Sequence, residues 1–460
     1  MRAVLAILGV LAFGSALRAQ APAPAPPAQS QGDQAGGAGN VGPAKPDSQP
    51  AGEPCQASLG HEWQVAVTDN APGDPIIDPV FKVSYAASVR GWAGQNNKLI
   101  PLFRVCCSPT NIERARTVAG LLARYYCYGR ERLVYVNSNG DGPKTETAFH
   151  DPAFPTPGAA LASAPHTTDF YLDDVDRGEG KEVDGYLFIF NASAPMHPVT
   201  VARDVAHEFS HLTLPGFRGF GQPEDWTNGY LGEVLYLQWL SEDTEETVAS
   251  REDIAKWANG RCNRLIEKFL KIGPAKIRDE PALHFWGFEG MLLYLRQIYG
   301  LELLARVINY QTDNGVPTLA RDLDLSISYA IKAMPWAPVV VPGTLTAGIS
   351  SADPGAPDAA WTWAEAGESL VLPPGSACRC WVYLRGDNRY KIRAEVDTDG
   401  WRMRGANLAA TTASLGLLSA TAPETLFYAN SEAWYEFQWR NIGDAPAVVQ
   451  GWSWSPIDKH

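Results

Sequence analysis

The chain has 460 residues, of which 45% are hydrophobic and 19% charged, a balance typical of a protein with a buried core. Its formal net charge of −13 at pH 7 disfavours nucleic-acid binding and a basic membrane-surface role, because both need positive charge to neutralise phosphate groups. The length predicts two or three domains of roughly 100–200 residues each.

The first segment has the layout of a secretory signal peptide. A positive N-terminus precedes an uncharged apolar run over 3–17, and small residues follow at Ala19 and Ala21, where we expect cleavage. Arg18 ends the run before the roughly 20 apolar residues that a bilayer span needs. We therefore interpret residues 1–20 as a signal peptide and expect a secreted or periplasmic protein without a membrane span.

Residues 21–53 are rich in Pro, Ala, Gly and Gln and contain no aromatic residue, which predicts a disordered linker. Seven cysteines are spread over the rest of the chain, and their odd number leaves at least one unpaired within it. In an oxidising compartment, disulfides among the first five are plausible, with a connectivity that the sequence does not fix. The cysteines are Cys55, Cys106, Cys107, Cys127, Cys262, Cys378 and Cys380.

Residues 54–342 mix strand and helix patterns, which predicts an α+β domain with a mixed sheet. A Ser-Pro start signal opens an amphipathic run over 108–127. Short β-branched, leucine-rich or aromatic runs predict strands at 132–136 and 186–190. Apolar residues at helical spacing predict four further helices, over Val199–Leu212, Tyr230–Leu240, about Ile254–Lys271 and Glu289–Tyr310.

Residues 343–460 have a different pattern and predict an antiparallel β-sandwich. Apolar and polar residues alternate over 390–395 and 435–440, with Gly-, Pro- and Asn-rich breaks between such runs. Eight of the fifteen tryptophans lie after residue 341. They could form the sandwich core, as alternating aromatics usually do, or a surface that binds polysaccharide.

The predicted helix 199–212 carries the motif His207-Glu208-Phe209-Ser210-His211. Residues four apart lie on one helix face, so the two imidazoles can bind one Zn²⁺ ion. Glu208 projects about 100° round the helix from His207, where it can accept a proton from a water molecule at the metal. The alternative is an ordinary amphipathic helix with two core or surface histidines.

A catalytic zinc site needs a third protein ligand and an open position for water. Glu233 is the first candidate, because it lies early in an otherwise apolar helix in which an unpaired buried carboxylate would be costly. A solvated glutamate favoured by the helix dipole is the alternative, and Glu224 and Asp225 are the reserve candidates for the ligand.

These features resemble the gluzincin metallopeptidases, the clan of the thermolysin-like endopeptidases and the zinc aminopeptidases. The resemblance covers roughly residues 110–335 and depends on HEFSH at 207–211, on Glu233 and on the apolar helix at 288–308. It implies a zincin-like fold in which His207, His211 and Glu233 bind zinc and Glu208 is the general base.

The resemblance also places Phe285 where aminopeptidase-type members have a tyrosine that stabilises the oxyanion. A phenyl ring has no proton to donate, so the candidates for this role are His284, Tyr230 and Tyr236.

Two functions are therefore expected. The first is a secreted zinc peptidase acting on peptide or protein substrates, with Glu208 activating the water. The second is a zincin scaffold without turnover that binds polysaccharide or protein at the cell envelope through its aromatic C-terminal domain. The intact Glu208 favours the first and Phe285 favours the second.

Overall fold

The computed structural model comprises two compact units, Met1–Gln49 and Pro50–His460, and all described residues belong to the second. The predicted signal peptide, the linker and most of the strand predicted at 132–136 lie outside the described residues. The described residues are 55–56, 63–69, 75–95, 98–132, 168–177, 181–183, 186–214, 216–243, 248–314, 319–334, 339–342, 370–396, 401–407, 413–418, 424–441 and 444–457.

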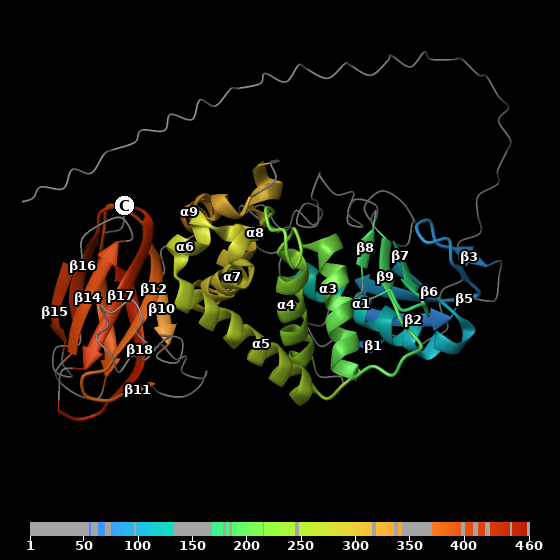
Figure 1. Ribbon diagram of the computed structural model, residues 1–460, viewed down its shortest axis with the longest axis horizontal. Helices are drawn as coiled ribbons and strands as arrows, with labels where there is room; N and C mark the ends of the chain where they lie inside the picture. The colour runs from blue at the N-terminus through green and yellow to red at the C-terminus, as the bar shows by residue number, and fades with distance from the viewer. Residues whose placement is uncertain are drawn as a thin grey trace, which may run out of the picture. The chain divides into compact units, whose positions relative to one another are not determined.

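The N-terminal part of this unit is a mixed seven-stranded sheet in the order β1-β2-β5-β6-β7-β9-β8 (Figure 1). The pairs β6–β7 and β7–β9 are parallel and the other neighbours are antiparallel. The strands are β1 (Cys55–Gln56), β2 (Trp63–Asp69), β5 (Ala87–Gln95), β6 (Lys98–Cys107), β7 (Thr168–Leu172), β8 (Lys181–Val183) and β9 (Tyr186–Ile189). A separate short hairpin pairs β3 (Ile76–Ile77) with β4 (Ser84–Tyr85).

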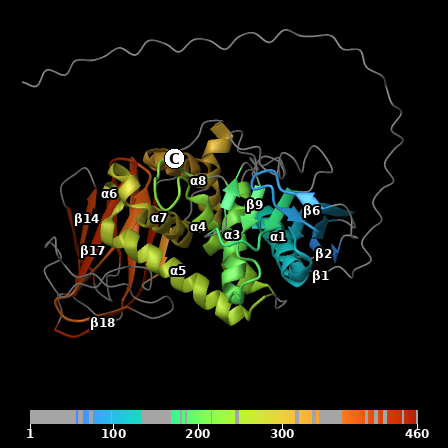
Figure 2. The same ribbon diagram turned by 45° about the vertical axis from the view of Figure 1, so that its right-hand side comes forward.

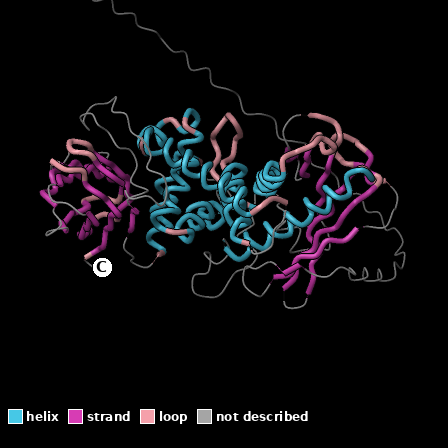
Figure 3. The backbone as a smooth tube through the Cα atoms, turned by 90° about the horizontal axis from the view of Figure 1, so that it is seen from below, coloured by secondary structure: helices cyan, strands magenta, loops and turns pink. Residues whose placement is uncertain are grey.

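Helix α1 (Ile112–Arg132) packs along strands β2, β5 and β6, and its apolar face is fully buried. Its sequence explains its start, because Ser108 is extended and Pro109 opens the 3₁₀ turn η1 (Pro109–Asn111) that leads into it. The helix continues to Arg132, where a strand was predicted. The tube in Figure 3 shows α1 beside the strands of this sheet.

In the described part of the chain, seven α-helices follow the sheet; the first carries the predicted HEFSH motif and the second carries Glu233. Helix α3 (Pro198–Thr213) lies between α1 and α4 (Asn228–Glu242), which Figures 1 and 2 both show. The later helices are α5 (Arg251–Ile272), α6 (Pro274–Asp279), α7 (Phe285–Tyr299), α8 (Leu301–Asn314) and α9 (Leu323–Ala333), with 3₁₀ turns η3 (Pro281–Leu283) and η4 (Ala320–Asp322).

The predicted helix 289–310 is two helices in the structure. Gly300 has a φ of +88°, a left-handed value that glycine adopts without strain, and it ends α7 by donating its N–H to the Arg296 carbonyl. Because the apolar spacing continues across Gly300, periodicity alone did not reveal the break.

The C-terminal part consists of two antiparallel sheets. One has the order β10-β18-β13-β16 with β11 paired to β18, and the other has the order β12-β17-β14-β15. The strands are β10 (Val339–Pro342), β11 (Leu370–Leu372), β12 (Ala377–Leu384), β13 (Asn388–Val396), β14 (Trp401–Asn407), β15 (Ala413–Leu418), β16 (Glu424–Ala429), β17 (Ala433–Asn441) and β18 (Ala447–Pro456). Strand β10 begins before residue 343, so these sheets include residues that we had placed in the first domain.

The tryptophans of the C-terminal sheets whose burial the structure describes lie in the core. They are Trp381, Trp434, Trp452 and Trp454, each at most 5% exposed. These four side chains therefore serve packing and offer no surface to a sugar.

Among the described residues, six cysteines are buried: Cys106, Cys107, Cys127, Cys262, Cys378 and Cys380. Cys106 and Cys262 carry free thiols, so the expectation of disulfides among the first five cysteines is wrong for these two. Within the described parts of the chain, no helix is both long and apolar enough to cross a bilayer.

Candidate metal centre

Helix α3 places the two motif histidines on one face, as the four-residue spacing predicts. His197 caps the helix by accepting the Val199 N–H, and Pro198 occupies the first helical position. The opposite face buries Val201, Val205 and Phe209 against the sheet and α1. The histidine face is therefore held toward α4 and the loop that precedes it.

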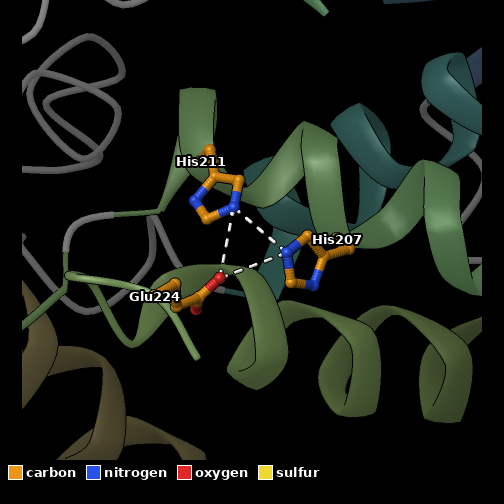
Figure 4. Close-up of side chains that lie close together, drawn as sticks. All are labelled: His207, His211 and Glu224. Atoms are coloured by element: carbon orange, nitrogen blue, oxygen red, sulfur yellow. Dashed lines mark hydrogen bonds and ion pairs between the residues drawn. The ribbon is translucent and has the colours of Figure 1, made fainter. Parts of the chain in front are cut away.

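Three side-chain atoms converge at this face (Figure 4). The Nε2 atoms of His207 and His211 are 3.1 Å apart, and Glu224 Oε2 lies 3.2 Å from the first and 3.4 Å from the second. Tetrahedral zinc with bonds of roughly 2.0–2.1 Å places its ligand atoms about 3.3 Å from one another. The three separations thus match a zinc coordination triangle, and the donor set of two imidazoles and one carboxylate suits this ion.

Among the described residues, the carboxylate that lies with the two histidines in a group able to hold a metal ion is Glu224, a reserve candidate in the sequence, and not Glu233. Glu233 contacts His207 from the other side of the ring, with its Oε1 2.9 Å from Nδ1. Its buried carboxylate is paired, as the sequence argument required, but the partner is a histidine N–H. Asp225 is exposed and lies 3.6 Å from the Arg218 guanidinium.

Both histidine rings are oriented by acceptors behind them. Glu233 accepts from His207 Nδ1, and the Asn228 side-chain oxygen lies 3.0 Å from His211 Nδ1. Asn228 is itself fixed, because its amide nitrogen donates to the Leu214 carbonyl. A proton on each Nδ1 leaves each Nε2 lone pair facing Glu224, which is the arrangement that ligating histidines adopt in metal sites.

The close approach of the three donors depends on Gly229, the second residue of α4. A Cβ atom there would lie 2.7 Å from His211 Cε1, 2.8 Å from His207 Cε1 and 2.8 Å from Glu224 Oε2. Only a residue without a side chain leaves this space open, which is a second feature that suits a bound ion.

Without metal, protons hold the cluster together. Burial lowers the pKa of His207, but hydrogen bonds to Glu224 and Glu233 outweigh burial and raise the pKa well above its usual value. Burial raises the pKa of Glu224, but hydrogen bonds from the two histidines lower this pKa by more, so the net shift is downward. Metal and protons therefore compete for the same atoms, so binding of an ion should release protons.

Glu208 lies beside this cluster and is 3% exposed, and its Oε2 has no hydrogen-bond partner among the described residues. Burial raises its pKa to about 7, against the charges of His207 and His211. It also lines a cavity of about 230 Å³ that His207, Tyr230 and Glu233 border as well. A carboxylate with a free oxygen at a cavity wall and a pKa near neutrality is suited to proton transfer.

The expected role of His284 does not fit its place in the structure. His284 precedes α7, its Nε2 is 3.9 Å from Glu280, and it is not among the residues that line the cavity. Tyr236 is buried, and its hydroxyl lies 3.4 Å from Thr213. Tyr230 lines the cavity, and its ring centroid is 4.6 Å from that of His207, so it is the best placed of the three candidates.

Comparison with known proteins gives little guidance. No protein-family profile matches the sequence, and no curated protein is significantly similar to it. The C-terminal CBM6 of LamC, a marine laminarinase from Zobellia galactanivorans, is 14% identical with a TM-score of 0.18, and the match covers 26% of this chain and 99% of that one.

Two multi-module enzymes match over a similar share of the chain. The CBM22-1–GH10 part of a Clostridium thermocellum xylanase is 8% identical, covering 26% of each chain with a TM-score of 0.18. The Podospora anserina GH26-CBM35 mannanase is 8% identical, covering 27% of this chain and 29% of that one with a TM-score of 0.17. These scores are too low to indicate a common fold.

Proposed function

We propose that this chain is a secreted zinc-dependent peptidase, and that His207, His211 and Glu224 hold the metal. The observation that carries the proposal is the convergence of two Nε2 atoms and one carboxylate oxygen within 3.4 Å, beside a buried carboxylate with an unpartnered oxygen. The proposal includes a zincin-like fold for residues 54–342 and export directed by the signal peptide at residues 1–20.

A zinc ion held there would supply a Lewis acid that polarises the scissile carbonyl and lowers the pKa of water. Glu208 accepts a proton from the attacking water and then passes it to the nitrogen of the leaving amine. Tyr230 borders the same cavity, where its hydroxyl can donate to the developing oxyanion. Glu233 and Asn228 hold the histidine rings in register throughout.

Hydrolysis of a denatured protein by zinc-loaded wild type and Glu208→Gln tests the proposal. The amide cannot accept the proton, so we expect the rate to fall by about 10²–10⁴-fold while bound zinc stays at the wild-type level. Glu113→Gln, on the exposed side of α1, is the matched control and should retain the wild-type rate. Equal rates in wild type and Glu208→Gln, including no hydrolysis by either, would favour the binding-protein alternative.

A further inference from the structure

One face of α5 forms a wall of the cavity next to the metal centre. It contributes Trp257, Arg261 and Arg264, which follow each other at helical spacing, and the opposite wall carries His207 and Glu208. Any substrate whose scissile bond reaches Glu208 must therefore place its neighbouring groups against this face of α5.

Two of the cavity's arginines form no ion pair with a carboxylate of the described residues. Arg203 bonds to Asp204 within the cavity, with its Nη2 2.6 Å from Asp204 Oδ1. Over the residues that the structure describes, neither Arg261 nor Arg264 forms an ion pair with a carboxylate. Two guanidinium groups are therefore available to a ligand.

The Arg261 guanidinium is held in place by aromatic rings. Its Cζ lies 4.5 Å from the Trp286 ring centroid and 5.8 Å from that of Tyr230. Stacking of this kind fixes the plane of a guanidinium and leaves its N–H edge free to donate. Arg264 lies one turn further along α5, is exposed and lines the same cavity, so the two guanidinium groups can act on one ligand as a two-arginine clamp.

Basic side chains also line a second cavity next to the first. A second and more open cavity of about 340 Å³ shares Trp257 and Arg264 with the first, and it is also lined by Lys256, His197 and Asp253. The shared residues join the two cavities into one path along α5. Arg264 lies where they meet, so an extended ligand passes it on leaving the metal centre.

We propose that Arg261 and Arg264 bind a carboxylate of the substrate next to the scissile bond, so that the enzyme selects peptides carrying an anionic group there. Guanidinium–carboxylate pairs are bidentate and strong, which favours this ligand over an uncharged one. The carboxylate is either an acidic side chain or the free C-terminus of the peptide. This inference rests on the proposed function for its substrate class.

The test measures binding of three peptides by calorimetry to the full chain carrying Glu208→Gln, with zinc and after zinc removal. The peptides are acetyl-Ala-Glu-Ala-amide, acetyl-Ala-Gln-Ala with a free C-terminus, and acetyl-Ala-Gln-Ala-amide. We expect at least one carboxylate peptide to bind about tenfold more tightly than the neutral one, with or without zinc. The tighter of the two identifies the source of the carboxylate.

Adding Arg261→Gln or Arg264→Gln should remove most of this preference, whereas Arg278→Gln on α6, outside both cavities, should leave it unchanged. Equal affinity for the three peptides, or an unchanged preference in both cavity variants, would overturn the inference. A preference that needs zinc would also overturn it, because the carboxylate would then be a metal ligand. Since binding is measured without turnover, the arginine clamp can stand even where peptidase activity fails.

Discussion

A histidine binds a metal only when its ring presents a nitrogen lone pair to the ion, so the residues behind the ring decide whether a site exists. In this chain Glu233 and Asn228 contact the Nδ1 atoms of His207 and His211, and so orient the two rings. The buried Glu233 carboxylate can therefore be explained without direct contact with the metal. Gly229 has the complementary role of leaving space in front of the rings.

Gly229→Ala tests the steric argument at this single position. Alanine is favoured over glycine in a helix by about 0.8–1 kcal/mol, so the fold should be retained. Its Cβ would nevertheless meet all three donor residues at 2.7–2.8 Å, and we expect zinc affinity to fall at least about tenfold. The matched control is Gly221→Ala, where a Cβ meets nothing within 4 Å. Zinc affinity is measured by chelator competition. A Gly229→Ala protein with wild-type zinc affinity would refute the claim that the three donors need the space that Gly229 leaves open.

Glu289 on α7 is fully buried, and neither of its oxygens has a hydrogen-bond partner among the described residues. Burial, and then the negative charge of Glu224, raises its pKa well above the usual value of 4.5, while Arg261 opposes the shift. The folded protein therefore keeps this proton at pH values where the unfolded chain releases it. The free energy of unfolding must then decrease as the pH rises above about 4.5.

Glu289→Gln removes this titration. In the metal-free protein we expect equal stability of wild type and variant below about pH 4.5 and a more stable variant above it, with a gap growing by up to about 1.4 kcal/mol per pH unit. Urea unfolding from pH 4 to pH 8 measures the gap, with Glu252→Gln at an exposed position as the control. A gap that is constant over this range would contradict the assignment.

At the scale of elements, the site depends on how closely α3 and α4 approach. The contact is made at Gly232, where a Cβ atom would lie 1.6 Å from Ser210 Oγ and 2.4 Å from Ser210 Cβ. Ser210 is fully buried and donates to the Ala206 carbonyl, so it cannot move aside cheaply. Since His207 and His211 lie on α3 while Asn228 and Glu233 lie on α4, any separation of the two helices also disturbs the ring orientations.

Gly232→Ala should therefore destabilise the protein by about 1–3 kcal/mol and weaken zinc binding at the same time. Gly120→Ala in α1 is the matched control, because its Cβ would make only an ordinary contact of 3.8 Å with Val67. There the helix propensity of alanine should dominate and increase stability by up to about 1 kcal/mol. Chemical denaturation and zinc titration of both variants give the comparison, and a Gly232→Ala protein as stable as wild type would exclude the close approach.

At the scale of the whole molecule, the mixed sheet with helices and the antiparallel C-terminal sheets follow the sequence patterns. Periodicity predicted α3, α4 and α5 to within a few residues, because their apolar faces are continuous. It missed the break at Gly300 and assigned β10 to the wrong side of the boundary, because a four-residue strand has too little pattern of its own.

The candidate site could be predicted only where local spacing determines it. His207 and His211 share a face of one helix, so their pairing follows from the helical repeat. Glu224 comes from the loop between α3 and α4, where no repeat relates sequence position to direction. Distinguishing Glu224 from Glu233 required the tertiary contact of Glu233 with His207 Nδ1. The sequence likewise could not predict that Arg261 and Arg264 line the cavity with His207, since this depends on how α5 packs.

Zinc content of the purified chain after dialysis, measured by elemental mass spectrometry, tests the central claim most directly. We expect about one zinc per chain in the wild type and in Asp225→Asn, the exposed neighbour of the third ligand, and less than about a tenth of that in Glu224→Gln and His211→Ala. A wild-type protein without zinc, or a Glu224→Gln protein with its full zinc content, would contradict the account.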